Sequence, residues 1–584
     1  MPNGDGPAGK KGEKKPNIIT LLVPYRSLIL FLIILSFLAN SSTLIIPKVI
    51  AGAIDGFAHG DFNPVRTIIT FLVFASLGFV FTYLQSLVQT YASEKVARDL
   101  RTQLSDQISR QSQAYIDQVN PNKLLTYLTS DVDSIKLFVS QAIVSIASSI
   151  FMILGISVLL LTTNWRLALA IIAIIPLIGV TFFLVLRKVR ALFIKSREVI
   201  DALNKVINES IIGSSLIRVL NSQQIEYEKF LNSNDMAKSL GLSILKLFAG
   251  LIPTIIFIAN LGSLTILLLG GHFVIGGSMT LGNFTAFNSY LALLIFPILI
   301  IGFMSNIIAQ AAASYGRISE VLNAPINSPK GILEEKLKGE IDFQNVTVLY
   351  GQKPALKNIS FTIQAGSKVA IIGPTAAGKS QLLYLLTGLT RPTEGKVLFD
   401  GREIDEYKPE AFYSQVGFVF QDSILFNMSL RENIAFSDTV TDQSLEKAIE
   451  TSELKDFIDN LPEKLNTLVS ERGTSLSGGQ KQRIMLSRAL AIDPKILLLD
   501  DFTARVDTQT EKRILENVQE RYPGITLISV TQKISSIEHY DQIFVLMQGE
   551  IIARGTHNEL MENSPEYVQI FNSQQSTSTY ELQS

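Results

Sequence analysis

Two short segments combine residue types that could do chemistry: one is rich in glycine and ends in Lys-Ser, the other ends in paired carboxylates. The first, GPTAAGKS, runs from Gly373 to Ser380 directly after the apolar run VAII. Its Gly-x4-Gly-Lys-Ser spacing lets backbone N–H groups point at phosphate oxygens, and the start of a following helix adds a favourable dipole. Lys379 could reach the β- and γ-phosphates, and Ser380 could ligate Mg²⁺. The alternative is a tight glycine turn before a core helix, but the preceding buried strand favours a phosphate loop.

The second segment, ILLLDDFTARVD, starts with four aliphatic residues at Ile496 and then reaches Asp500 and Asp501. A run of this kind is typical of a buried strand that delivers acidic side chains to a site at its carboxyl end. Asp500 is therefore a candidate ligand of Mg²⁺, which prefers hard oxygen donors. The alternative is an aspartate that caps the following turn. A phosphate loop in the same domain favours the metal role.

The composition of the chain indicates a membrane protein with several domains. Its 584 residues exceed a single hydrophobic core, only 18% of them are charged, and the mean hydropathy is positive. The absence of cysteine excludes disulfides and thiolate metal sites. A net charge of −1 gives no reason to expect nucleic acid as a partner.

Long stretches without charged residues predict an all-α transmembrane domain over residues 18–322. About 20 helical residues cross the hydrocarbon core of a bilayer. The charge pattern predicts six spans, at about residues 26–48, 66–92, 137–163, 166–188, 246–270 and 281–310. Residues 1–17, rich in Gly, Pro and Lys, are expected to be a disordered tail before a membrane anchor that is retained rather than cleaved.

The distribution of basic residues predicts how the spans are oriented. Residues 92–136 carry six Lys or Arg and residues 187–246 carry ten, whereas the opposite loops carry one or two each. The positive-inside rule therefore places both long loops and both termini in the cytoplasm, with the chain in the cytoplasmic (inner) membrane. The loops keep a helical pattern, which predicts helices that continue beyond the bilayer; independent soluble subdomains are the alternative.

Beyond the spans the pattern changes to that of a soluble α/β domain. Residues 323–338, with two prolines and a charged run, are expected to be a linker. Residues 339–575 alternate short β-rich runs with helical segments, which is typical of a mostly parallel sheet covered by helices. We assign the nucleotide-binding domain to residues 339–575 and expect it in the cytoplasm. Residues 576–584 are expected to be a tail.

Between the phosphate loop and the aspartate-ended strand lies the pentapeptide LSGGQ, which consists of Leu476, Ser477, Gly478, Gly479 and Gln480. With these two elements in this order, the chain resembles ATP-binding-cassette (ABC) transporters, as a half-transporter of the exporter type over about residues 18–575. The resemblance implies a P-loop NTPase fold, with ATP and Mg²⁺ as cofactors. It also implies that two cassettes pack head to tail, so that each ATP lies between one phosphate loop and the other subunit's signature. A small hydroxyl and two glycines at a helix start fit that anion-binding role.

Further site residues follow from the resemblance. Tyr350 matches the aromatic residue that stacks on adenine, and Gln421 matches the glutamine that touches Mg²⁺ and the membrane domain. Asp507 ends the loop Ala504–Asp507 between the cassettes, and Glu471-Arg472-Gly473 matches a segment that contacts the cytoplasmic loops. The expected nucleotide-binding residues are Tyr350, Gly373, Pro374, Thr375, Ala376, Ala377, Gly378, Lys379, Ser380, Gln381 and Gln421, with Ser380, Gln421 and Asp500 at the metal.

Two catalytic positions depart from the family pattern. Asp501 stands where the family has a glutamate that acts as general base or orients water, and Gln532 stands where it has a histidine that contacts the γ-phosphate. Gln381 also replaces the usual Ser or Thr. We therefore expect a site that binds Mg-ATP and barely hydrolyses it, in a heterodimer with a second half-transporter whose hydrolysing site uses this chain's intact signature. The alternatives are a homodimer with slow turnover and an ATP-gated channel or regulatory subunit.

The spans also bear on the cargo. Their interiors hold uncharged polar residues rather than ionisable ones, at Asn40 to Thr43, Gln85, Gln89, Gln141, Asn260, Asn288, Asn306 and Gln310. Intramembrane charge would indicate ion or proton coupling. Its absence favours export of a small apolar or amphipathic substrate such as a drug, lipid or peptide, although these amides could equally join helices. A soluble ATPase module is excluded by the six spans.

Overall fold

The computed structural model describes residues 18–326, 331–350, 353–470, 473 and 476–581. The chain divides into a helical unit, Met1–Ser109 with Asn120–Pro325, and a second unit, Arg110–Val119 with Ile326–Ser584. The expected tail at residues 1–17 and the segment Glu471-Arg472 lie outside the described residues.

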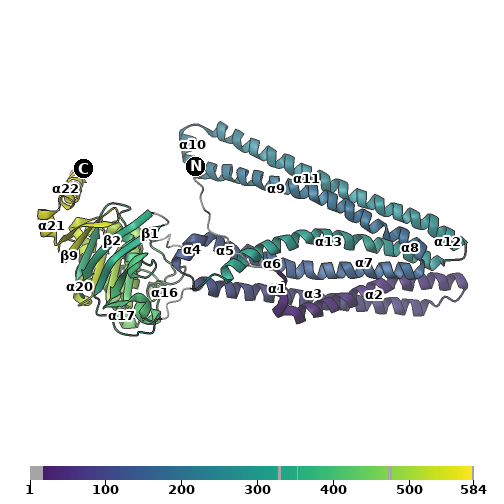
Figure 1. The fold of residues 1–584 in the computed structure, drawn as a ribbon, viewed down its shortest axis with the longest axis horizontal. Coiled ribbons are helices and arrows are strands. Elements are labelled where there is room, and N and C mark those ends of the chain that lie inside the picture. The colour runs from purple at the N-terminus through teal and green to yellow at the C-terminus, as the bar shows by residue number, and fades with distance from the viewer. Residues whose placement is uncertain (1–17, 327–330, 351–352, 471–472, 474–475, 582–584) are drawn as a thin grey trace. The chain divides into compact units, whose positions relative to one another are not determined.

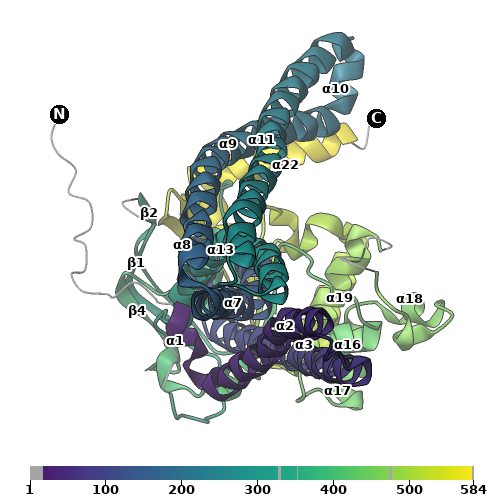
Figure 2. The same cartoon turned by 90° about the vertical axis from the view of Figure 1, so that its right-hand side faces the viewer.

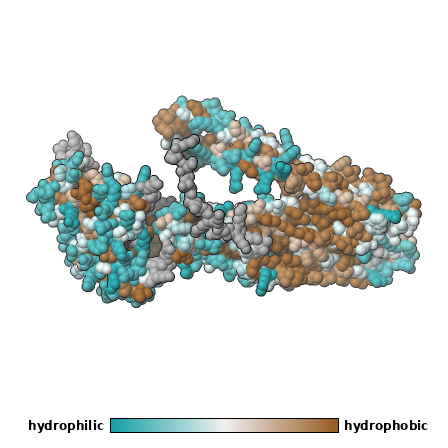
Figure 3. All heavy atoms as spheres, viewed as in Figure 1, coloured by the Kyte–Doolittle hydropathy of each residue, from teal (hydrophilic) through white to brown (hydrophobic). Residues whose placement is uncertain are grey.

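Among its described residues, the helical unit contains six helical segments long and apolar enough to cross a membrane, as predicted: Thr20–His59, Pro64–Ser109, Pro121–Thr163, Trp165–Ile212, Gln223–Ile275 and Leu281–Leu322. On the face shown in Figure 3, an apolar band covers much of these helical segments. Their helices are α1 (Ile18–Leu22), α2 (Arg26–His59), α3 (Pro64–Ser109), α5 (Pro121–Thr126), α6 (Val132–Leu137), α7 (Ile143–Thr163), α8 (Trp165–Ile172), α9 (Ile174–Ile212), α10 (Ser214–Val219), α11 (Gln223–Thr265), α12 (Gly271–Ile275) and α13 (Leu281–Leu322). π-Helical turns at Tyr127–Asp131, Phe138–Ala142 and Ile266–Gly270 join successive helices.

Local sequence explains where two of these helices begin. The Asn164 side chain accepts a hydrogen bond from Leu167 N at 3.2 Å and caps α8, at the predicted turn between the third and fourth spans. Thr280 caps α13 in the same way, through Asn283 N at 3.1 Å. Side-chain oxygens at these positions satisfy backbone N–H groups that have no partner inside the helix.

Close packing inside the helical unit depends on small residues. A Cβ added at Gly302 on α13 would lie 1.9 Å from the Phe182 ring on α9, so the glycine provides the space that this ring occupies. Near the cytoplasmic ends predicted above, Asp131 is buried, and Arg317 donates to it through Nε at 2.8 Å. Packing of small residues and polar contacts therefore tie α13 to α9 and to the third span.

One pair of helices leaves the rest of the unit. Figures 1 and 2 both show α9 and α11 side by side, diverging from α7 and α13 toward α10. Large apolar side chains near α10 are exposed: Ile211 is 67% exposed, Ile212 76% and Val219 82%. An exposed apolar cluster of this size is unusual on the surface of a folded domain and marks a candidate contact surface.

The second unit is the predicted α/β domain, built on two sheets. The larger has the order β10-β9-β3-β8-β7-β6, with all neighbours parallel except β10, and the smaller is the antiparallel β2-β1-β4-β5. The strands are β1 (Ile341–Tyr350), β2 (Lys353–Ile363), β3 (Lys368–Ile372), β4 (Glu394–Phe399), β5 (Arg402–Glu403), β6 (Val416–Val419), β7 (Ile496–Asp500), β8 (Thr526–Val530), β9 (Gln542–Met547) and β10 (Glu550–Gly555). The helices are α4 (Gln113–Val119), α14 (Lys379–Leu386), α15 (Pro409–Tyr413), α16 (Leu430–Ile434), α17 (Asp442–Thr451), α18 (Lys455–Asp459), α19 (Gly478–Ala491), α20 (Thr508–Arg521), α21 (His557–Asn563) and α22 (Pro565–Glu581).

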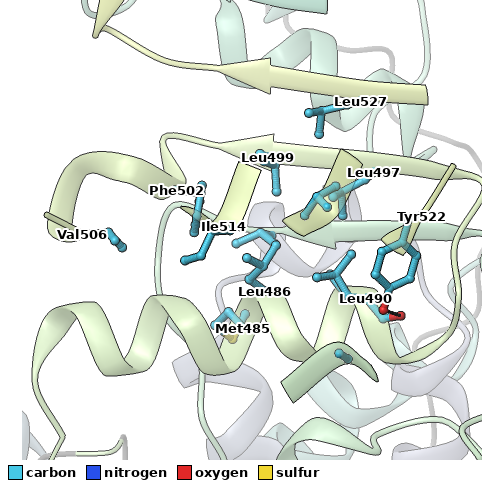
Figure 4. Close-up of a cluster of buried hydrophobic side chains, with 14 of the residues drawn as sticks. Met485, Leu486, Leu490, Leu497, Leu499, Phe502, Val506, Ile514, Tyr522 and Leu527 are labelled. Atoms are coloured by element: carbon cyan, nitrogen blue, oxygen red, sulfur yellow. Dashed lines mark hydrogen bonds between the residues drawn. The ribbon is translucent and has the colours of Figure 1, made fainter. Parts of the chain in front are cut away.

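A single apolar cluster fixes the elements that carry the candidate site. Leu497 and Leu499 of β7 pack with Met485 and Leu486 of α19 and with Ile514 of α20 (Figure 4). Every residue of β7 is buried, which explains its continuous aliphatic sequence. The strand that ends in Asp500, the helix that begins after Ser477 and the helix that follows Asp507 therefore share one core.

Candidate nucleotide site

Four parallel strands that lie next to one another deliver the predicted site residues to one edge of the larger sheet. In sheet order β3-β8-β7-β6, the carboxyl ends lead into Gly373, Gln532, Asp501 and Gln421 respectively. Parallel strands meet their ligands at this edge, where helix N-termini also gather. The fold thus brings together residues that are far apart in the sequence.

The phosphate loop has the backbone geometry that its glycines predict. A Cβ at Gly373 would lie 2.0 Å from the Leu546 carbonyl oxygen, so the loop passes directly over β9 and has no room for a side chain there. Gly378 has a φ of 104°, in the left-handed region, immediately before α14. Pro374, Thr375 and Ala376 are exposed, whereas Ala377 is buried and anchors the loop.

Lys379 is held over the loop. Its ammonium group donates to the carbonyl oxygens of Gly373 and Pro374, each at 2.9 Å. Burial lowers the pKa of Lys379, and the nearby carboxylates of Asp501 and Asp500 oppose that shift. The ammonium group therefore lies against the loop, where it would stabilise an anionic phosphate.

The two aspartates occupy different environments. Asp500 is 2% exposed, and burial raises the pKa of its carboxyl group, while a hydrogen bond with Ser380 lowers it. This pairing of a carboxylate with the loop hydroxyl provides the hard oxygen donors that Mg²⁺ requires. Asp501 is half-buried with a φ of 46°, and its N–H donates to the Val530 carbonyl oxygen at 2.9 Å. The backbone of Asp501 is thus fixed beside β8.

Gln532 follows β8 and is exposed, beside this edge. Thr531 N donates to the Ile371 carbonyl oxygen at 3.3 Å, which places the segment next to the end of β3. The Gln532 carbonyl oxygen accepts a hydrogen bond from Nε2 of Gln574 on α22. Gln574 was not predicted, because no sequence signal connects a C-terminal glutamine to a residue 42 positions earlier.

Gln421 is exposed, and its carbonyl oxygen accepts a hydrogen bond from Gln482 Nε2 on α19 at 3.3 Å. The side chain of Gln421 is therefore open to a ligand while its backbone is tied to the signature helix. Tyr350 ends β1, and its side chain lies outside the described part of the structure. Gln381 lies in the first turn of α14.

The signature forms the N-terminus of α19. Ser477 Oγ accepts from Gln480 N at 3.2 Å, and Gln480 Oε1 accepts from Ser477 N at 2.8 Å, which is a capping box. Leu476 packs against the core cluster on the other side. The next backbone N–H groups, at Gly478 and Gly479, belong to the helix end that attracts anions.

Arg505 lies against the N-terminus of α19, although nothing in the sequence marked this arginine as a site residue. A Cβ at Gly478 would lie 3.1 Å from Arg505 Cδ, and one at Gly479 would lie 2.9 Å from the Arg505 carbonyl oxygen. Arg505 is exposed, while Asp507, two residues later, caps α20 by accepting from Thr510 N at 2.9 Å. The loop between β7 and α20 thus lies against the signature and adds a cation to it.

Comparison with known proteins agrees with this geometry. Residues 29–298 match the family model of the ABC transporter transmembrane region, and residues 356–504 match the ABC transporter model. The uncharacterized ABC transporter ATP-binding protein YknU of Bacillus subtilis (strain 168) is 31% identical over 568 residues, which cover 94% of this chain and 96% of that protein. The chain belongs to the ABC transporter family.

Similarity to other relatives of this ABC transporter also extends over most of the length of both proteins. The multidrug resistance-like ATP-binding protein MdlA of Buchnera aphidicola subsp. Schizaphis graminum is 30% identical, over 94% of this chain and 96% of that one. An ATP-dependent lipid A-core flippase of Syntrophus aciditrophicus is 29% identical, over 84% and 82%. The structure of a bacterial Atm1-family ABC exporter with ATP bound matches with a TM-score of 0.76 at 24% identity, over 94% of this chain and 99% of that one, which confirms the predicted fold.

The family and the site agree on the cofactors and the reaction. The cassette binds ATP with Mg²⁺ and couples ATP hydrolysis to transport, and six spans make the chain a multi-pass membrane protein. The site fits Mg-ATP. The phosphate loop supplies N–H donors, Lys379 supplies a cation, and the Asp500–Ser380 pair supplies oxygen ligands, all at one edge of the larger sheet.

Proposed function

We propose that this chain is one half of a heterodimeric ABC exporter, whose own site holds ATP and hydrolyses it slowly while its signature completes the partner's site. The observation that carries the proposal is Asp501. Its backbone is fixed beside β8, so the carboxylate is drawn back by about 1.5 Å relative to a glutamate at the same place. Misplacement of about 1 Å can cost on the order of 100-fold in rate.

Gln532 supports the same conclusion. Its carboxamide is neutral at every physiological pH, so it cannot place a positive charge against a terminal phosphate as a protonated imidazole can. The residues that hold nucleotide remain: the loop glycines, Lys379, and the pairing of Ser380 with Asp500. Binding groups without a well-placed water-orienting group give a site that keeps its ATP.

Two observations support a second half-transporter as the partner. Apart from its chain neighbours and the backbone of its own helix, only Arg505 among the described residues has atoms within 4 Å of a Cβ placed on Gly479, so no described phosphate-loop atom of this chain lies against that glycine. The exposed apolar side chains around α10, including Ile212 and Val219, also offer a surface to which a second subunit can bind. A head-to-tail second subunit would supply both, through its own phosphate loop and its own helices.

The cargo we propose is a small apolar or amphipathic molecule such as a drug or lipid. The uncharged interiors of the spans support it, as do relatives named for multidrug resistance and for a lipid flippase. We place both termini and the nucleotide domain in the cytoplasm, because the basic residues gather there. ATP-driven accumulation of a labelled drug or lipid against a gradient tests this assignment of the cargo.

The chain purified without a second half-transporter tests the heterodimer. We expect little ATP hydrolysis and no transport in liposomes, with nucleotide binding retained, because both water-orienting positions are weakened in every site that two copies can form. Adding a half-transporter that carries Glu and His at the corresponding positions should restore both activities. A self-paired complex that hydrolyses ATP rapidly and transports would establish the homodimer instead.

Arg505 offers a finer test of the composite site. Arg505→Ala is expected to raise the KM for ATP at the partner's site about threefold, because it removes an exposed cation beside the signature, while Arg505→Lys should keep most of the affinity. Steady-state ATPase measurements on the complex provide the readout. Equal KM values for both variants and the unmodified chain would show that Arg505 does not contribute to ATP binding at that site.

A further inference from the structure

We propose that Gln574, on the C-terminal helix α22, is a positioning residue of the nucleotide site that holds the backbone of residues 532–534 beside Asp501. One side chain makes both contacts. Gln574 Oε1 accepts from Ile534 N at 3.0 Å, and Gln574 Nε2 donates to the Gln532 carbonyl oxygen. A carboxamide can pair with a backbone N–H and a backbone C=O at once, as a neighbouring strand would.

Helix α22 is fixed firmly enough to act as a holder. Tyr567 is completely buried, and its hydroxyl lies 2.7 Å from His557 Nδ1 on α21. Ile570 and Phe571 pack against the main apolar cluster of the domain. Gln574 lies four residues after Ile570 and three after Phe571, so it is on the face of the helix that packs against the domain.

The opposite side of the segment is held as well. Lys533 Nζ lies 3.6 Å from a carboxylate oxygen of Glu511, which is 1% exposed on α20. Glu511 comes four residues after Asp507, the capping residue of the same helix. The pocket that Thr531 and Ser536, on either side of the segment in sequence, line together with Glu511 and Tyr540 measures only about 10 Å³, which leaves little free space there.

The position of the segment explains why holding it affects nucleotide. Thr531 N donates a hydrogen bond to the carbonyl oxygen of Ile371 near the end of β3, and Asp501 N donates one to the carbonyl oxygen of Val530 at the end of β8. A shift of residues 532–534 would therefore change the distances between Gln532, Asp501 and the phosphate loop. The C-terminal helix would therefore set the geometry of a site to which it contributes no ligand. This inference rests on the function proposed above for the role of residue 532 and for the heterodimer used in the test; the two hydrogen bonds of Gln574 do not.

The test uses the full heterodimer with its partner's site blocked by substitution of that site's phosphate-loop lysine. Gln574→Leu removes both hydrogen bonds at similar size, and Gln574→Glu keeps the acceptor for Ile534 N but loses the donor. Gln569→Leu, on an exposed position of the same helix, is the matched control. We expect amide hydrogen exchange at Ile534 to rise about tenfold in Gln574→Leu, less in Gln574→Glu and not in the control.

Release of a fluorescent ATP analogue from this chain should become severalfold faster in Gln574→Leu, at an unchanged melting temperature of the complex. Unchanged exchange at Ile534 would overturn the tether, and raised exchange with unchanged release would overturn the positioning role. In the Asp501→Glu, Gln532→His background, Gln574→Leu should reduce the gain from the histidine. Should that background show no gain with or without Gln574, the assignment of the slow hydrolysis to Asp501 and Gln532 fails, while the exchange and release results still decide the tether.

Discussion

Replacing Asp501 by glutamate and Gln532 by histidine is expected to raise ATP hydrolysis at this chain's own site by on the order of 100-fold. The longer carboxylate recovers about 1.5 Å of reach from a backbone that is fixed by the hydrogen bond to Val530. The imidazole adds a group that can carry a proton near neutral pH, which the carboxamide cannot. The measurement is the ATPase rate of a heterodimer whose partner carries glutamine in place of its catalytic glutamate.

Two controls make this result specific. Lys379→Ala in the doubly substituted chain should remove the gain, because the ammonium group that lies over the loop is lost. Asp501→Glu alone should give part of the gain, since the two positions act on the same step and are not additive. An unchanged rate in the double variant would place the deficit elsewhere in the site.

Gly478→Asp is expected to lower hydrolysis at the partner's site by roughly 100- to 1,000-fold, the range seen when a preorganised donor for developing negative charge is removed. The new carboxylate would stand at the positive end of α19 and repel phosphate. It would also press on Arg505 Cδ, which lies 3.1 Å from a Cβ at this position. ATPase assays of the unmodified heterodimer and of this variant give the ratio.

Binding of nucleotide to this chain's own loop distinguishes the composite site from a local defect. In Gly478→Asp, a fluorescent ATP analogue should still bind at Lys379 with unchanged affinity, since the signature is expected to serve the other subunit. Ser477→Ala is the milder companion, which loses the helix cap at a cost of about 1 kcal/mol without adding charge. If Gly478→Asp instead abolished binding at this chain's own loop, the signature would belong to the same site as Lys379.

Local patterns were sufficient to predict the elements that carry the candidate site. The strand before Gly373, the strand before Asp500 and the helix that starts after Ser477 were expected from short stretches of sequence: aliphatic runs, a glycine spacing, and a hydroxyl followed by two glycines. The six spans follow from the absence of charge in the same way. Each of these features depends on residues within about one helix or strand of one another.

The arrangement of those parts could not be predicted in the same way. The order β3-β8-β7-β6, which brings Gln532 between the phosphate loop and Asp501, is a long-range property that local sequence patterns do not specify. Gln574 and Arg505 were missed because their contacts are with backbone atoms of distant residues, which impose no pattern on the sequence. The separation of α9 and α11 from α13 was not predicted, because the apolar residues of these two helices have the same pattern as those of helices that pack inside a bundle.

The nucleotide found on each chain after turnover tests the central claim most directly. The heterodimer would be incubated with a photoreactive, radiolabelled ATP, crosslinked during steady-state hydrolysis, and the two chains separated before their bound nucleotide is identified. Our account predicts intact triphosphate on this chain and diphosphate on its partner. Diphosphate on both chains in equal amount would contradict it, because this site would then turn over as fast as the other.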